Sequence, residues 1–274
     1  MQPINEYHRP PTLNAALALL ARPYPLTRPL AGGTHILQGE PEYEDLVDLA
    51  DLGLGEITRT GQGWRLGATA TLEALAAAEG LPFALRRAAA RQASSHTRRR
   101  ATLGGAIAVR DSGPLLACLL ALHGQVEIAP DRRTIPLADH LAGPIESRQD
   151  IALILALTFD AGRYVGMAEI TRTPADAPLL CVAVGAVPED GRLTRVIVAA
   201  GATGQPLALC RNAADRLEGS PVGTDVSFGN ADETIAWRDD GRASADYRQA
   251  MLPVLVRRAS AELLAACGEV HHAG

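Results

Sequence analysis

The sequence predicts an α+β fold in two parts. Short helical and strand-like stretches alternate up to about residue 129, with turns between them. Polar, glycine and proline residues then interrupt the pattern between Asp139 and Asp150. Beyond this break, strand-like runs come first and helical stretches follow, an order typical of an α+β domain. We therefore expect one domain over residues 1–147 and a second over residues 148–274, with the boundary near residues 145–150.

The first domain should begin with a helix and a glycine turn. The stretch Thr12–Ala21 is rich in apolar residues, and Thr12 or Asn14 can cap it. Prolines keep the following stretch extended as far as Ala31-Gly32-Gly33-Thr34, after which we expect a short helix through Leu37. The next expected elements are a strand at Leu46–Leu49 and a hairpin in which Gly61-Gln62-Gly63 joins Glu56–Thr60 to Trp64–Ala68. Two helices should follow, one that starts at Thr71 and another over Pro82–Gln92.

A second glycine turn, Thr102-Leu103-Gly104-Gly105, follows the arginine run Arg98–Arg100 and precedes an apolar helix, Leu115–Leu122. Paired glycines let the backbone approach a ligand closely, and successive N–H groups in such a turn bind anions. The alternative is a tight turn before a buried helix, beside arginines that are solvated or paired with carboxylates. The similar turn at Ala31–His35 favours an anion-binding role for both.

The remaining expected elements complete the two parts. They are a strand at Gln125–Ala129, strands at Ile151–Phe159, Leu179–Val187 and Leu193–Ala200, a turn at Pro188–Gly191, and helices at Gln205–Leu217 and Ala243–Ala266.

The composition is that of an ordinary globular protein. Of the 274 residues, 47% are hydrophobic and 21% are charged, and the net charge is −5. This acidic balance argues against nucleic acid or an anionic membrane as a partner. No apolar run approaches the length of a membrane span, and Met1–Glu6 lacks the features of a signal peptide. We expect a cytoplasmic protein.

Several chemistries are excluded by residue type. All 26 cationic side chains are arginine, so Walker-type phosphate loops, Schiff-base enzymes and lysine general bases are ruled out. The cysteines stand far apart, which fits neither an iron–sulfur cluster nor a zinc site, and the histidines show no metal-ligand spacing. We therefore expect no metal on this chain, and cysteines that are core residues: Cys118, Cys181, Cys210 and Cys267. We find no Ser-His-Asp or paired-carboxylate arrangement.

With both glycine turns placed, the chain resembles the FAD-binding subunit of the molybdenum hydroxylases, the xanthine dehydrogenase and carbon monoxide dehydrogenase family. The resemblance covers nearly the whole chain and rests on motifs in the family's order. They are Ala31-Gly32-Gly33-Thr34, Leu46–Leu49, Leu66-Gly67-Ala68-Thr69, Ala93–Arg98 with Thr102-Leu103-Gly104-Gly105, and Ala243–Arg248 with Val254–Ala259.

The resemblance implies a fold, a cofactor and partners. The fold would be a two-lobed FAD-binding domain of the PCMH type followed by the C-terminal domain of these subunits. The cofactor would be FAD, and the partners a [2Fe–2S] subunit and a molybdopterin subunit, in a heterotrimer or its dimer. Electrons would pass from the partner's iron–sulfur centres through FAD to an external acceptor. The residues expected at the cofactor are Ala31, Gly32, Gly33, Thr34, His35, Ile36, Thr102, Gly104, Gly105, Ala106 and Asp111.

Some positions depart from the family pattern. Ala106 and Val109 stand where the family commonly has polar residues, and the loop from Asp111 to the next helix lacks an acid that reaches the cofactor. Glu169 stands at about the place of a family lysine, where it would disfavour an anionic reduced flavin if it points inward. These departures leave open an alternative, a structural or assembly subunit that has lost FAD. A stand-alone FAD enzyme is a third reading, for which no candidate base is visible.

Overall fold

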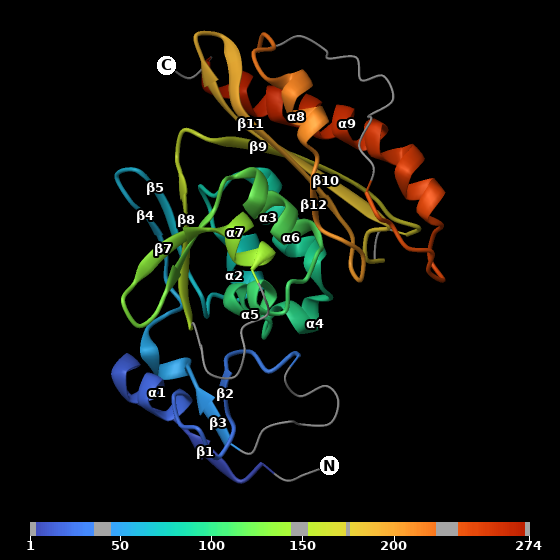
Figure 1. The fold of residues 1–274 in the computed structure, drawn as a ribbon. Helices are drawn as coiled ribbons and strands as arrows, with labels where there is room; N and C mark the ends of the chain where they lie inside the picture. The colour runs from blue at the N-terminus through green and yellow to red at the C-terminus, as the bar shows by residue number, and fades with distance from the viewer. Residues whose placement is uncertain (1–3, 36–44, 144–152, 174–175, 223–234, 272–274) are drawn as a thin grey trace.

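The computed structural model describes residues 4–35, 45–143, 153–173, 176–222 and 235–271. In these residues three β-sheets follow one another from the N-terminal to the C-terminal end of the molecule, with helices between and outside them (Figure 1). The mixed α and β architecture confirms the predicted fold class.

The N-terminal lobe is a small parallel sheet with one helix. Its strands, in spatial order, are β1 (Glu6–His8), β3 (Asp45–Asp48) and β2 (Thr27–Leu30). Helix α1 (Leu13–Leu20) begins at Thr12, whose side chain accepts a hydrogen bond from the Ala15 N–H. This confirms the predicted helix and its cap. The short helix expected through Leu37 extends beyond the described residues.

The middle part is a five-stranded antiparallel sheet covered by helices. Its strands, in spatial order, are β4 (Ile57–Arg59), β5 (Gly63–Gly67), β8 (Ile154–Asp160), β6 (Gln125–Ile128) and β7 (Arg133–Pro136). Its helices are α2 (Leu72–Ala77), α3 (Phe83–Gln92), α4 (Ser95–Arg98), α5 (Leu103–Ala108), α6 (Pro114–Ala121) and α7 (Leu137–Ala142), whereas the short helix η1 (Ala50–Leu52) packs with the N-terminal lobe. The predicted β4–β5 hairpin is confirmed, as is the Thr71 cap of α2.

Strand β8 belongs to the middle sheet, not to the C-terminal part in which we expected the run Ile151–Phe159. It lies between β5 and β6 and pairs with both, so it is a buried central strand. The middle sheet is therefore complete only at Asp160. The domain boundary near residue 147 stays a prediction, and this pairing favours a later one.

The C-terminal part is a four-stranded antiparallel sheet covered on its outer face by two helices. In spatial order the strands are β12 (Ala208–Leu209), β11 (Arg192–Gly201), β10 (Leu180–Glu189) and β9 (Tyr164–Ile170), and the helices are α8 (Arg211–Leu217) and α9 (Ala245–His271). The β10–β11 hairpin turns at Asp190 and Gly191, as predicted, and both have positive φ. Across the described ranges, no helix is long and apolar enough to cross a membrane.

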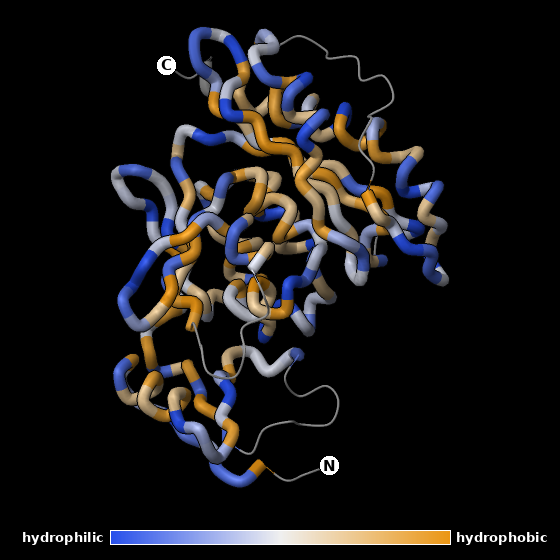
Figure 2. Tube along the Cα trace, viewed as in Figure 1, coloured by the Kyte–Doolittle hydropathy of each residue, from blue (hydrophilic) through white to orange (hydrophobic). Residues whose placement is uncertain are grey.

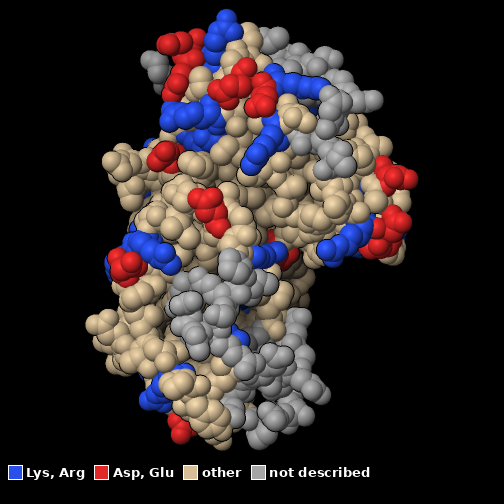
Figure 3. All heavy atoms as spheres, viewed as in Figure 1, with Lys and Arg blue, Asp and Glu red and all other residues tan. Residues whose placement is uncertain are grey.

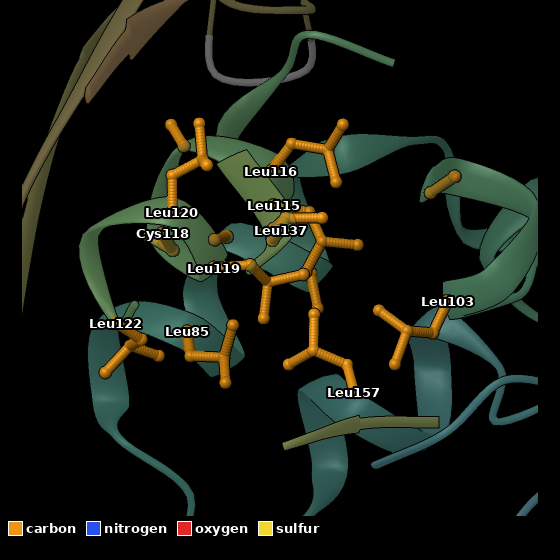
Figure 4. Close-up of a cluster of buried hydrophobic side chains, with 14 of the residues drawn as sticks. Leu85, Leu103, Leu115, Leu116, Cys118, Leu119, Leu120, Leu122, Leu137 and Leu157 are labelled. Atoms are coloured by element: carbon orange, nitrogen blue, oxygen red, sulfur yellow. The ribbon is translucent and has the colours of Figure 1, made fainter. Parts of the chain in front are cut away.

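Helix α6 is the centre of the hydrophobic core. All of its residues are buried, because it lies between the middle sheet and the inner face of the C-terminal sheet. Figure 4 shows its leucines beside Leu85 of α3 and Leu157 of β8. The outer face of the C-terminal sheet packs against α8 and α9 in a second cluster. Hydrophobic residues accordingly follow β10, β11 and the inner helices (Figure 2).

The end of α6 touches the C-terminal sheet at backbone distance. A Cβ on Gly185 of β10 would overlap the carbonyl oxygen of Ala121, so only glycine allows this approach. The same oxygen accepts a 2.7 Å hydrogen bond from Nε of Arg163, which is 6% exposed. Burial lowers the pKa of Arg163 to about 10, which still leaves the guanidinium charged at neutral pH. A buried cation thus caps the end of α6.

We predict that Gly185→Ala lowers the free energy of unfolding by about 1–3 kcal/mol, because the added methyl forces β10 away from α6. The measurement is urea unfolding followed by circular dichroism. Gly162→Ala is the matched control, since a Cβ there meets nothing within 4 Å. Equal midpoints for the two variants would contradict the close approach.

A fully buried arginine, Arg248, anchors the segment before α9. It is 0% exposed and donates to the carbonyl oxygens of Leu179, Arg238 and Ala243. It also donates to Asp240 Oδ2 at 2.8 Å, and this hydrogen bond holds the pKa of Asp240 well below its usual range. The segment entering α9 is thereby fixed against the start of β10.

Because of the Asp240 carboxylate, the free energy of unfolding should depend on pH in the acidic range. Its pKa is lower in the folded state than in the unfolded chain, so its contribution is present above about pH 4 and is lost as the pH falls further. We predict that Asp240→Asn is less stable at pH 7 and shows a shallower loss of stability between about pH 5 and pH 2.

The measurement is urea unfolding at a series of pH values. Asp215→Asn on α8 serves as the control because the structure gives Asp215 no ion pair among the described residues. Parallel pH profiles for the wild type and Asp240→Asn would contradict the role of the Arg248–Asp240 pair.

Candidate functional site

The two glycine turns open onto one cavity of about 450 Å³. It lies where the N-terminal lobe meets the middle sheet, and its apolar wall includes Leu49, Leu153 and Ile154. Eight of the residues expected at a cofactor line it: Ala31, Gly32, Gly33, Thr34, His35, Thr102, Gly104 and Gly105. The two turns, far apart in the sequence, are therefore adjacent in space.

The first turn leaves strand β2 and lies against the arginine run. Gly33 has a φ of 71°, a conformation that glycine adopts without strain. A Cβ on Gly32 would overlap the carbonyl oxygen of Arg100, so this glycine permits close contact between the two turns. Among the described residues, no hydrogen bond uses the N–H groups of Gly32 and Gly33. These two N–H groups remain available to a ligand at the cavity.

The second turn uses its own N–H groups differently from our expectation. The Leu103 N–H donates to Ala70 O, and the Gly104 N–H donates to Ala68 O at 2.7 Å. The Gly105 N–H donates to Thr102 Oγ1 at 3.2 Å, so Thr102 acts as the N-cap of α5. The protein itself therefore provides acceptors for the N–H groups of Gly104 and Gly105, and an anion-binding role for them stays a prediction.

Gly104 has a packing role instead. A Cβ on it would lie 2.9 Å from the Cβ of Ala68 and 3.0 Å from its carbonyl oxygen. Glycine therefore lets α5 lie directly on the end of β5. A Gly104→Val substitution would disturb this contact as well as the cavity.

The other three expected residues, Ala106, Asp111 and Ile36, are not among the cavity-lining residues that the structure describes. Ala106 is buried on the inner side of α5 and is not part of the cavity wall. Asp111 also lies away from the cavity, because the chain turns after Val109 towards α6, and its N–H donates to Ala106 O. Ile36 lies outside the described residues. Val109 does line the cavity with an apolar side chain that is 41% exposed.

In the arginine run, Arg98 has a structural role. Arg98 donates to Glu73 Oε2 at 2.9 Å and to the carbonyl oxygens of Ala90 and Ala93, so it ties α3, α4 and α2 together. Arg99 and Arg100 are exposed. Neither lines the cavity. On the face drawn in Figure 3, basic and acidic side chains are interspersed, with no broad basic surface.

Glu169, which we considered as a possible negative charge beside a flavin, forms an ion pair with Arg91 instead. Its Oε1 accepts a 2.6 Å hydrogen bond from Nε of Arg91, and its side chain is 19% exposed. This ion pair joins α3 to β9. Glu169 is consequently engaged within the protein, and its carboxylate does not stand alone.

Sequence reasoning missed one cation at the cavity. Arg28 of β2 lines it, three residues before the first glycine turn, and the described residues provide it with no ion pair. Arg28 could have been found from the sequence, because it stands on an extended strand that leads straight into a glycine turn. Side chains on the last residues of such a strand must lie near the turn. In the part of the chain that the structure describes, the cavity thus combines the unused N–H groups of the first turn, the Arg28 side chain and an apolar wall.

Comparisons with known proteins identify the family of this chain and similar folds. Residues 2–159 match the family model described as the FAD binding domain in molybdopterin dehydrogenase. The chain is 30% identical to the Escherichia coli K12 protein YgfM, and the match covers 96% of both chains. It is 29% identical to the nicotine 6-hydroxylase medium subunit of Paenarthrobacter nicotinovorans, with 95% of this chain and 97% of that one covered. A chain of the Cu,Mo-CO dehydrogenase in its cyanide-inactivated form superposes with a TM-score of 0.78 at 25% identity, covering 95% of this chain and 97% of that one.

Proposed function

Because the chain belongs to the family that carries the FAD-binding domain of molybdopterin dehydrogenases, we propose that it is the FAD-binding, electron-transfer subunit of a cytoplasmic oxidoreductase of the molybdenum-hydroxylase type. Its partners in this proposal are a [2Fe–2S] subunit and a molybdopterin subunit. Bound FAD supplies the redox chemistry, taking electrons from the iron–sulfur centres and giving them to an external acceptor. The part of this chain is to bind and orient the cofactor.

One observation carries the proposal: both glycine turns line the same cavity. Its volume lies in the range of small-molecule sites, and apolar walls with a few polar groups are typical of them. The two unused N–H groups of the first turn suit a diphosphate, because N–H groups in such a turn bind anions. The residues present therefore fit part of a dinucleotide.

Arg28 supplies the positive charge for this role. Its guanidinium has no carboxylate partner among the described residues, and it reaches the cavity beside the first turn. Arginine binds phosphate oxygens through two parallel N–H groups, and such charge-assisted bonds are stronger than neutral ones. Arg28 would thus hold the diphosphate in place of the second turn's N–H groups.

The chain's own contacts also support a second candidate, a subunit that keeps the fold but has lost FAD. The N–H groups of Gly104 and Gly105 are already satisfied, and Val109 offers no hydrogen bond. A neutral hydrogen bond contributes about 0.5–1.5 kcal/mol, so two or three missing contacts, worth about 1–4.5 kcal/mol, weaken binding by roughly fivefold to two-thousandfold.

We predict that the isolated chain carries less than one FAD per chain and fills when FAD is added. The measurement is an absorbance spectrum with a flavin titration, on the isolated chain and on the chain assembled with its two partner subunits. Full occupancy without added FAD would contradict weak binding. No binding even in the assembled complex would favour the FAD-free scaffold.

We further predict that Val109→Asn tightens FAD binding by about tenfold, because it adds one hydrogen-bonding side chain to the cavity wall. Leu209→Asn is the control: Leu209 is 40% exposed, close to the 41% of Val109, but lies outside this cavity. The dissociation constants follow from flavin fluorescence titration. A Val109→Asn constant equal to that of the control would mean that the cofactor does not reach this wall.

A further inference from the structure

Three potential metal ligands gather on one face of the N-terminal sheet, away from the glycine turns. Glu6 and His8 lie two residues apart on β1, so their side chains share a face, and Glu6 is the register partner of Asp45 on β3. Nε2 of His8 lies 3.3 Å from Glu6 Oε2 and 3.3 Å from Asp45 Oδ2. The three ligand atoms all lie within 4.8 Å of one another.

Asp45 is the unusual member of this cluster. Its side chain is only 2% exposed, and its second oxygen, Oδ1, is buried with no hydrogen-bond partner. A buried carboxylate is costly unless it is paired or coordinates a metal ion. Thr27, its neighbour on β2, does not satisfy it, because the Thr27 hydroxyl donates to Pro25 O.

The described residues offer no other compensating cation. Arg9, the nearest arginine along β1, makes a bidentate pair with Asp51. Within the described ranges, the cationic contacts of Glu6 and Asp45 are both to His8. Two carboxylates therefore share one imidazole, which leaves the cluster negative whether or not His8 is protonated.

We propose that Glu6, His8 and Asp45 bind a divalent transition-metal ion, with Zn²⁺ as the best fit. One imidazole nitrogen and two carboxylate oxygens suit this ion, at bond lengths of about 2.0–2.2 Å. Ligand atoms around a tetrahedral ion with such bonds stand roughly 3.3–3.5 Å apart. The two measured separations of 3.3 Å match that edge. Glu6 is 64% exposed, so water has access to the remaining position.

The ion would act as a clasp between β1 and β3. Strand β3 pairs on its other side with β2, which leads directly into the first glycine turn. Metal binding to the folded lobe would stabilise the framework of that turn without touching the cavity. This goes beyond the flavin role and departs from our expectation of a chain without metal.

The test is isothermal titration of the full, tag-free chain with ZnCl₂, together with urea unfolding in the presence and absence of the ion. Asp45→Asn and His8→Gln remove one ligand each while keeping the side-chain size close. Asp51→Asn is the control carboxylate on the same lobe. A double variant, His271→Ala with His272→Ala, controls for binding by the C-terminal histidine pair.

We expect one Zn²⁺ per chain, affinity reduced at least about tenfold in each ligand variant, and no change in either control. With Zn²⁺ at about 100 times its dissociation constant, the unfolding equilibrium constant of the wild type should fall about a hundredfold. Absence of binding, binding kept in both ligand variants, or binding lost in the histidine-pair control would each overturn the proposal. If Asp45→Asn fails to fold, His8→Gln decides alone, because His8 lies at the rim of the lobe.

Discussion

The structure depends on the burial of α6 between two sheets. Every residue of this helix is buried, and its last carbonyl oxygens approach β10 so closely that Gly185 cannot carry a side chain. Interiors pack at crystal-like density, so a helix shared by two sheets fixes their relative position. Arg163, directly before β9, completes this contact because its guanidinium donates to the carbonyl oxygen of Ala121 at the end of the helix.

The glycines of the two turns serve different purposes that look alike in sequence. Gly33 provides a backbone conformation, Gly32 and Gly104 permit close packing, and only the first turn keeps N–H groups for a ligand. The turn that resembles an anion site more closely, with arginines before it and a helix after it, is the one whose donors are already used. A glycine pair in the sequence therefore indicates where a candidate site lies better than it indicates which backbone groups would contact a ligand there.

Local signals predicted much of the fold. The Thr12 and Thr71 caps, the β4–β5 and β10–β11 hairpins and helix α6 all follow from residues adjacent in sequence. Strand β8 was expected in the C-terminal part, because its pairing with β5 and β6 is a long-range property that local sequence does not reveal. Strand β9 was missed because Gly166 and Glu169 interrupt its apolar pattern. At the cavity, the two turns were predicted, whereas the position of Arg28 required the three-dimensional arrangement.

The shared core has a consequence for the evolution of this chain. Val165, Met167, Cys181 and Ala183 of the C-terminal sheet belong to the same hydrophobic cluster as α6, so the inner face of this sheet shares one interior with the middle part. A fragment ending at Asp160 would expose one side of α6 to water, and the remaining fragment would expose the inner face of its sheet. Recombination could therefore exchange the C-terminal part between relatives only when the matching α6 surface is inherited with it.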